Sequence, residues 1–265
     1  MKPLEMTIAH RYGHAERPPC AAGILAGATS APEHQSASRA GNCASGEYVA
    51  GDVALLKNVA VLFADIAGFT GLSEGVSPVA TLDLLRRYHA RMAEAVIGHG
   101  GVVRQYSGDS ILATFDAPSG EPRAATCSLA CAYDMLATLA CWNAKRRLRG
   151  RFPVNIGIGI HIGEVAMGEI GIGRHVEQSI AGDVVNVACK LERMTRKARQ
   201  QLIVSHELFD AIEQDGGGVD LLSVLTACGD SKVPGRLNRV RIWGLHHGAT
   251  PPAHATGRDR PLPGI

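Results

Sequence analysis

Two aspartates stand where the sequence predicts strands to end. Asp65 follows Val59–Ala64 (VAVLFA), a continuous apolar run typical of a buried strand. Asp109 lies in the turn of a predicted hairpin between two short apolar runs, Val102–Tyr106 and Ile111–Phe115. If the two strands are neighbours, the carboxylates converge. Paired carboxylates at the rim of a sheet suit Mg²⁺ or Mn²⁺, which also bind substrate phosphates.

The turn after Asp65 contains Gly68, Phe69 and Thr70, and its backbone N–H groups are suited to holding a phosphate. A purely structural interpretation also fits the spacing, with Asp65 as a helix cap and Asp109 as a turn residue. The sequence lacks the other common phosphate and metal motifs, namely GxxxxGK[ST], a full GxGxxG and HExxH.

The elements around the aspartates alternate between helices and strands. Ser77-Pro78 predicts a helix start, and the apolar stripe of this helix ends before Gly98. The other predicted helices are Ala124–Leu148, Val184–Arg199 and one from Ser205. The stripe consists of Val79, Leu82, Leu85, Tyr88, Met92 and Val96.

Further strands are predicted at Val154–Ile162, whose glycines permit close backbone approach, and at Val165–Ile170, returning antiparallel to it. Short strands follow at Leu202–Val204, near Leu221–Leu225 and at Val240–Trp243. We therefore expect an α/β sandwich with helices on a mostly antiparallel sheet.

Composition supports one dense folded block in a chain of 265 residues with 46% hydrophobic residues. Residues 1–52 lack a helical or strand period and are expected to be a flexible leader or the remnant of an upstream region. Residues 246–265 are expected to be a disordered tail, which leaves 53–245 as the folded domain. A net charge of +2 predicts no strong global attraction to nucleic acid or to anionic membranes.

The seven cysteines are scattered and odd in number, which favours a reducing, cytoplasmic location. Cys127 and Cys131 are expected to be core residues of a helix rather than metal ligands, because neither has a partner at ligand spacing. No apolar run has the length of a membrane span. One basic run has two interpretations, a nucleic-acid site or a solvated helix end, and the second is favoured because no aromatic residue interrupts the run. The run is Lys145, Arg146, Arg147, Arg149 and Arg151.

Four ordered motifs resemble the class III nucleotidyl cyclase catalytic domain. The resemblance covers about Asp52–Leu245, and it favours the catalytic interpretation of the two aspartates. The motifs are VAVLFADIAGFTGLSE (Val59–Glu74), YSGDSILATF (Tyr106–Phe115), GIGIHIGEVAMGEIG (Gly157–Gly171) and SIAGDVVNVACKLERM (Ser179–Met194).

This resemblance implies a ferredoxin-like, βαβ-based fold and an adenylate cyclase activity that converts ATP to cyclic AMP and pyrophosphate. Asp65, Asp109 and the carbonyl of Ile66 match the ligands of two Mg²⁺ or Mn²⁺ ions. Gly68, Phe69 and Thr70 match the triphosphate turn. Asn186 matches the ribose-orienting asparagine. It also implies a head-to-tail homodimer in which each site takes its metals from one chain and its base and ribose contacts from the other.

Three positions depart from the family pattern. Gln105 replaces the usual base-reading lysine, and Ser179 replaces its usual Asp or Thr partner. The Gln105 amide can donate to adenine and the Ser179 hydroxyl can accept, so ATP is favoured, although the glutamine also suits guanine. Lys190 replaces the arginine that stabilises the reacting phosphorus and lacks its bidentate fork. Where many members have V-K-G-R, this chain has Val233-Pro234-Gly235-Arg236, which leaves Lys232 or Arg236 as substitutes for the missing lysine.

These departures leave two alternatives open. In the first, the chain is a weakly active or inactive cyclase-fold domain that binds nucleotide and acts as a dimerising regulator. In the second, it is a guanylate cyclase. The presence of Asp65, Asp109 and Asn186 favours an active enzyme over a regulator.

Overall fold

A computed structural model of the chain describes residues 55–116, 123–172, 175–216, 218–233 and 239–249. The predicted leader and residues 250–265 of the predicted tail lie outside these ranges, as do Pro234, Gly235 and Arg236. The elements in chain order are β1 (Leu55–Ile66), α1 (Phe69–Glu74), α2 (Pro78–Gly98), β2 (Val102–Ser107), β3 (Ser110–Asp116), α3 (Ala124–Arg147), β4 (Ile156–Ile172), β5 (His175–Ala181), α4 (Asp183–Ala198), β6 (Gln200–Ser205), α5 (His206–Asp215), α6 (Val219–Leu222), β7 (Thr226–Ser231) and β8 (Val240–His246).

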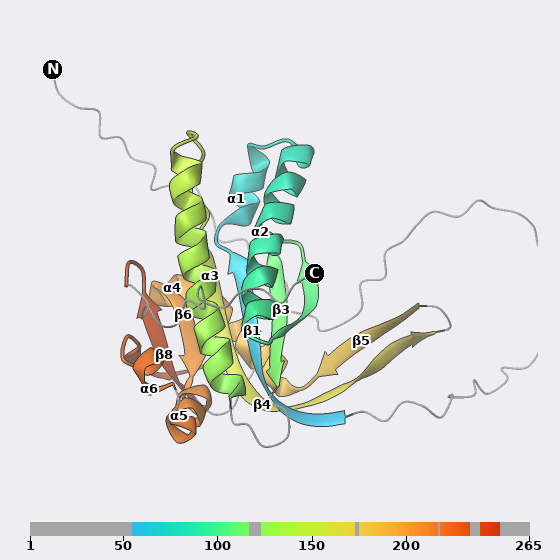
Figure 1. Cartoon of the computed structure of the whole chain (residues 1–265), viewed down its shortest axis with the longest axis vertical. Coiled ribbons are helices and arrows are strands. Elements are labelled where there is room, and N and C mark those ends of the chain that lie inside the picture. Colours follow the sequence, from blue (N-terminus) through green and yellow to red (C-terminus); the bar gives the residue numbers. More distant parts are fainter. Residues whose placement is uncertain (1–54, 117–122, 173–174, 217, 234–238, 250–265) are drawn as a thin grey trace, which may run out of the picture. The chain divides into compact units, whose positions relative to one another are not determined.

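The strands form one sheet in the order β2-β3-β1-β4-β6-β8-β7, with β5 paired to the second half of β4 (Figure 1). All pairs are antiparallel except β4 with β6, which are parallel. The predicted class, helices on a mostly antiparallel sheet, is confirmed.

Helices cover both faces of the sheet, and the alternation of side chains along β1 explains why. Leu62 and Ile66 pack with α2 and α3 in the larger core. Val59 and Val61 point to the other face, where they pack with residues of α4. All four side chains are fully buried, as expected of a central strand buried on both faces.

Helix α2 begins as predicted. The Ser77 hydroxyl accepts a hydrogen bond from the backbone N–H of Ala80, and Pro78 occupies the first turn. Tyr88, Met92 and Val96 are buried, but the predicted stripe is wrong at its start, because Val79 is 80% exposed. Leu82 is also exposed. The first two turns extend beyond the part of the sheet that would cover them (Figure 1).

Glycines let α4 lie directly on β4, as the sequence predicted. A Cβ added at Gly159 would overlap the backbone nitrogen of Glu192 and the carbonyl oxygen of Ala188. A Cβ at Gly163 would lie 2.8 Å from Val184, whereas one at Gly157 would overlap Thr195. The helix therefore runs antiparallel to the strand, with its C-terminal half over the beginning of β4.

Two strand predictions are wrong. Val154–Ile162 and Val165–Ile170 are not a hairpin but parts of the single 17-residue strand β4, and the returning strand is β5. Gly163 resembles a turn residue in the sequence, but it lies opposite Val59 of β1 in regular pairing. The strand predicted near Leu221–Leu225 is instead the short helix α6, and β7 follows it.

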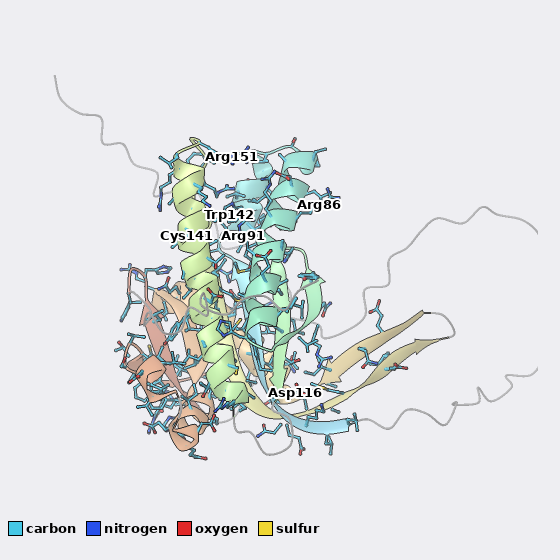
Figure 2. All side chains as sticks on the ribbon, in the orientation of Figure 1. Arg86, Arg91, Asp116, Cys141, Trp142 and Arg151 are labelled. Atoms are coloured by element: carbon cyan, nitrogen blue, oxygen red, sulfur yellow. The ribbon has the colours of Figure 1, made fainter. Side chains whose placement is uncertain are left out.

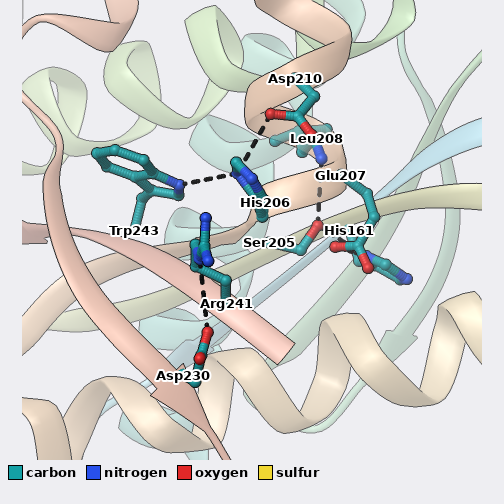
Figure 3. A network of polar contacts seen from close by, with 9 residues as sticks. All are labelled: His161, Ser205, His206, Glu207, Leu208, Asp210, Asp230, Arg241 and Trp243. Carbon is teal, nitrogen blue, oxygen red and sulfur yellow. Dashed lines mark hydrogen bonds and ion pairs between the residues drawn. The ribbon is translucent and has the colours of Figure 1, made fainter. Parts of the chain in front are cut away.

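Hydrogen bonds fix α5 to the sheet (Figure 3). The Ser205 hydroxyl, at the end of β6, caps α5 by accepting from the backbone N–H of Leu208 and lies 2.7 Å from Nδ1 of His161 on β4. The indole N–H of Trp243 on β8 lies 3.4 Å from Nδ1 of His206. These contacts tie β4, β6 and β8 to one helix end.

Helix α3 is the central helix of the larger core. It contacts α2, α5 and the strands β1, β3 and β4. Contrary to the expectation from sequence, it has the length and hydropathy of a membrane span, but more than half of its apolar part is buried inside the protein, as in the core helix of a folded domain. Cys131 is fully buried there and Cys127 packs against the same core, as predicted, and burial raises the pKa of the Cys131 thiol.

Candidate functional site

The two predicted carboxylates come from adjacent strands. Strands β1 and β3 pair so that Asp65 lies opposite Ser110, the residue after Asp109. Opposite residues of an antiparallel pair have Cα atoms roughly 4.5–5.5 Å apart. Asp65 is buried and Asp109 is half-buried. The prediction that the two strands are neighbours and bring the carboxylates to one rim is confirmed.

Both carboxylate oxygens of Asp65 have partners. The Ser110 hydroxyl donates to Oδ1 at 2.9 Å. Arg196, near the end of α4, donates from Nη2 to Oδ2 at 2.6 Å, and the same nitrogen lies 3.2 Å from Oε1 of Glu192. Asp65 therefore sits in a buried polar cluster between the sheet and α4, oriented by one neutral donor and one cation.

The turn that carries Asp109 is fixed from α2. Gly108 has a φ of 58°, in the left-handed region that favours glycine. His89 lies 2.8 Å from the Gly108 carbonyl through Nε2, which donates, and its ring contacts the edge of Tyr106. The hairpin tip is therefore held by a side chain of the neighbouring helix as well as by its own ladder.

The phenol of Tyr88 is influenced by both carboxylates. Its side chain is fully buried. Burial, followed by the negative charges of Asp65, Asp109 and Glu192, raises the pKa of its phenol well above the usual value. Direct contacts agree with this grouping, because Asp65 and Glu192 share Arg196 and Asp109 directly precedes Ser110, which donates to Asp65.

The predicted phosphate turn follows Asp65 directly. Gly68 precedes α1 with a φ of 72°, and the amide of Ala67 donates to the Asn155 carbonyl at 2.8 Å, which ties the end of β1 to the start of β4. Phe69 packs against the core, whereas Gly68 and Thr70 are exposed. The turn therefore presents its backbone on the same rim as the carboxylates.

Asn186 and Lys190, four residues apart, share one half-buried face of α4, but they do not meet Asp65 within one chain. Asp65 lies opposite Gly157, where the C-terminal half of α4 packs. Arg196 is the residue of α4 that contacts Asp65, and Asn186 precedes it by ten residues. This separation is roughly 15 Å along the helix axis.

The two predicted base-reading residues lie on opposite sides of β1. Gln105 is exposed on the edge strand β2, next to a bulge, and pairs with Leu112 of β3. Ser179 is half-buried on β5 and pairs with Gly168 of β4. Among the described residues no hydrogen bond joins Gln105 to Ser179.

Sequence reasoning missed four residues that support the site: Tyr88, His89, Ser110 and Arg196. The i, i+4 spacing of Glu192 and Arg196 signals an ion pair, but not that the pair reaches Asp65. Ser110 follows Asp109 directly, and only the register of β1 and β3 reveals its contact.

Comparisons with known proteins agree with this geometry. Residues 52–247 match the family described as Adenylate and Guanylate cyclase catalytic domain. An adenylate cyclase from Anabaena cylindrica is 31% identical over 156 residues, which are 57% of this chain and 30% of that protein. The match therefore spans less than a third of the relative's length.

Solved structures show the same fold. The adenylyl cyclase CyaB from P. aeruginosa superposes with a TM-score of 0.63 at 26% identity, over 73% of this chain and 95% of the other. The guanylyl cyclase Cya2 superposes with a TM-score of 0.63 at 28% identity, over 75% of this chain and 98% of the other. On the evidence of its sequence match and its fold, the chain belongs to the adenylate and guanylate cyclase catalytic domain family.

Proposed function

We propose that the chain is an adenylate cyclase that converts ATP to 3′,5′-cyclic AMP and pyrophosphate in the cytoplasm. The observation that carries the proposal is the convergence of Asp65 and Asp109 on adjacent strands. Adenylate cyclase is also the name of the Anabaena relative.

The residues at the rim fit two divalent cations. Hard oxygen ligands are available from the carboxylates of Asp65 and Asp109 and from the Ile66 carbonyl at the end of β1. Asp65 and Glu192 are both bonded to one cation, Arg196, so the two carboxylates carry more negative charge than this partner supplies in positive charge. Such a concentration of negative charge favours Mg²⁺ or Mn²⁺. When bound, these ions acidify the attacking 3′-hydroxyl and neutralise the triphosphate.

The protein's own part in the reaction is to hold the substrate in line. The backbone after Gly68 is placed to accept the phosphates beside the two carboxylates. Asn186 would orient the ribose, and Lys190 would place one positive charge near the α-phosphate, where charge develops during attack. Positioning and electrostatics are the main requirements of phosphoryl transfer, so no covalent intermediate with the protein is needed.

The separation of these groups supports a head-to-tail homodimer. Asp65 lies at the C-terminal half of α4 and Asn186 near its beginning, so one chain does not bring them together. A second copy of the chain, turned head to tail, would bring its own α4 to the carboxylates of the first. Each of the two sites would then use both chains.

The base contacts favour adenine. The Gln105 amide can donate to N1 and the Ser179 hydroxyl can accept from N6. Since glutamine can also pair with guanine, GTP is the substrate to test as a competitor. Lys190 in place of arginine favours slow turnover, which is the observation behind a second candidate, a nucleotide-binding regulator of the same fold.

The test is to measure cyclic nucleotide and pyrophosphate release from ATP and from GTP with Mn²⁺ and with Mg²⁺. We expect cyclic AMP to form only with a divalent cation. Asp65→Ala and Asp109→Ala should each lower turnover more than about 100-fold, or roughly 2.7 kcal/mol. Asp116→Ala is the matched control, because Asp116 lies at the other end of β3 and pairs with Lys57 on the surface (Figure 2). Nucleotide binding without turnover would instead support the regulator.

A further inference from the structure

A cavity of about 240 Å³ lies between α2 and α3, on the face of the sheet opposite α4. Its lining is almost entirely cationic. Figure 2 shows Arg91 and Trp142 facing each other there, with Arg151 at the C-terminal end of α3. The lining residues are Arg87, Arg91, Trp142, Lys145, Arg146, Arg149 and Arg151.

The cavity has an ordered wall. Trp142 is buried, and the guanidinium carbons of Arg91 and Arg146 lie 4.8 and 4.9 Å from its ring centre. Arg91 also donates to the Arg87 carbonyl at 2.6 Å. Arg146 donates from Nε to the Phe152 carbonyl at 2.8 Å. Two of the six cations are therefore fixed by stacking and hydrogen bonds.

The end of α3 brings like charges together. The amide of Arg151 donates to the Arg146 carbonyl, and the amide of Gly150, whose φ is 64°, donates to the Arg147 carbonyl. These are the two bonds of a Schellman motif, in which the residues at the positions of Arg146 and Arg151 usually make an apolar contact. Burial and the charge of Arg151 lower the pKa of Arg146. A local rule broken in this way is typical of a functional site.

Little negative charge balances this cluster. Arg87 pairs with Asp83 at 2.9 Å, and no carboxylate among the described residues forms an ion pair with the other five lining cations. The whole chain has a net charge of only +2, so this face is a local concentration of positive charge. Such a concentration of positive charge is suited to binding an anionic ligand.

Exposed apolar side chains flank the same cations. Leu148 is 89% exposed and Phe152 is 82% exposed, and they alternate along the chain with Arg147, Arg149 and Arg151. Cations interleaved with exposed large apolar residues are typical of a surface that lies on a membrane. We propose that this end of the domain, the α3 basic surface, docks on anionic phospholipid membranes, with lipid phosphates in the cavity and Leu148 and Phe152 at the acyl boundary.

Other anionic ligands fit the surface less well. A single-stranded nucleic acid would need several aromatic faces for base stacking. Arg91 and Arg146 cover the Trp142 ring, so Phe152 is the one exposed aromatic side chain among the described residues of this surface, and its exposed apolar neighbour Leu148 has no ring to stack on a base. A soluble phosphate compound would bind the cations but would leave the apolar side chains of Leu148 and Phe152 exposed to water. The α3 basic surface also lies on the opposite face of the sheet from α4, so docking is compatible with the homodimer proposed above.

The test is co-sedimentation of the full chain with vesicles of phosphatidylcholine alone and with about one-quarter phosphatidylglycerol. We expect binding only to the anionic vesicles, weakened by salt. Arg149→Glu/Arg151→Glu should lower the partition coefficient at least about tenfold. Leu148→Ser/Phe152→Ser should also weaken binding while leaving its salt dependence in place.

The matched control is Lys197→Glu/Arg199→Glu, which makes the same charge change at the exposed C-terminal end of α4. It should bind anionic vesicles like the unmodified chain. The melting temperatures of the Arg149/Arg151 variant and of the control, measured side by side, separate lost binding from unfolding. Equal binding to both vesicle types would overturn the proposal, and so would a loss of binding in the control as large as in the Arg149/Arg151 variant. Full binding by the Leu148/Phe152 variant, together with displacement from the vesicles by inorganic pyrophosphate, would also overturn it.

Discussion

Arg196 and Asp65 are 131 residues apart in the chain and form an ion pair of 2.6 Å between Nη2 and Oδ2. Asp65 is the buried partner, whereas about a third of the Arg196 side chain is exposed. The pair joins the end of β1 to the last turns of α4. It also places a protein cation at an oxygen that we propose to be a metal ligand, so Arg196 and a divalent cation would compete for Asp65.

Arg196→Gln should reveal this competition. Without metal, the buried Asp65 and Glu192 carboxylates lose a cation, and we expect the free energy of unfolding to fall by about 1–2 kcal/mol, given the partial exposure of Arg196. With Mn²⁺ the variant should regain more stability than the unmodified chain, because the metal no longer displaces a guanidinium. Denaturant titration with and without Mn²⁺ measures both effects.

Lys197→Gln is the control for this experiment, since Lys197 is the next residue of the helix and is exposed. It should change neither quantity by more than about 0.5 kcal/mol. An Arg196→Gln protein with unchanged stability in the absence of metal would show that the ion pair contributes nothing to the fold.

Gly159→Ala should displace α4 from the sheet. An added Cβ would overlap backbone atoms of Ala188 and Glu192, which cannot rotate away as a side chain can. We expect a loss of about 2 kcal/mol or more in the free energy of unfolding, and lower turnover because α4 carries Asn186. Gly75→Ala is the matched control, because no atom lies within 4 Å of the added Cβ and φ is −97°. Equal stability of the two variants would contradict the close packing.

The same glycines show what the sequence does and does not predict about the fold. Their placement in an alternating strand signalled close backbone approach, and the structure confirms it. Gly163 also misled the prediction, since a glycine next to Glu164 resembles a turn, whereas the pairing with Val59 of β1 makes it part of a long strand. Pairing over 17 residues is a tertiary property, and local patterns do not reveal it.

The site divides in a similar way. Asp65, Asp109 and Gly68 were predictable because strand ends and tight turns have local signatures. Tyr88 appeared in the sequence only as one member of an apolar stripe, because its neighbours Asp65 and Asp109 come from other elements. The contact of His89 with the Gly108 carbonyl is equally invisible, since a lone histidine on a helix carries no spacing signal.

The shared-site dimer predicts complementation. Asp65→Ala and Asn186→Ala should each be inactive alone, because every site in either homodimer lacks a required group. In a mixture, one of the two sites of each heterodimer would have both groups intact. We expect the mixture to recover measurable cyclic AMP formation, up to about half of the heterodimer's full capacity. If subunit exchange is demonstrated, for example by two affinity tags, and activity stays absent, then the two residues do not meet across a dimer.

Lys190 most clearly separates an active enzyme from a regulator. In the active enzyme its ammonium group is a point charge where the family places a planar guanidinium. Lys190→Arg should preserve or raise kcat, because the guanidinium can hold two phosphate oxygens at once. Lys190→Ala should lower kcat by about 10- to 100-fold, because the contact strengthens in the transition state, and it should raise KM by a smaller factor.

The alternative for Lys190 is a solvated cation on the half-buried face of α4 that has no contact with substrate. Under that interpretation Lys190→Ala would leave kcat unchanged and alter stability by no more than about 0.5 kcal/mol. Steady-state kinetics with ATP and Mn²⁺ on both variants distinguish the two cases, and Lys197→Ala on the same helix corrects for a general loss of charge. An unchanged kcat in Lys190→Ala would remove this residue from the site. A kcat that falls in Lys190→Ala but is preserved or raised in Lys190→Arg would support a positive charge beside the reacting phosphate.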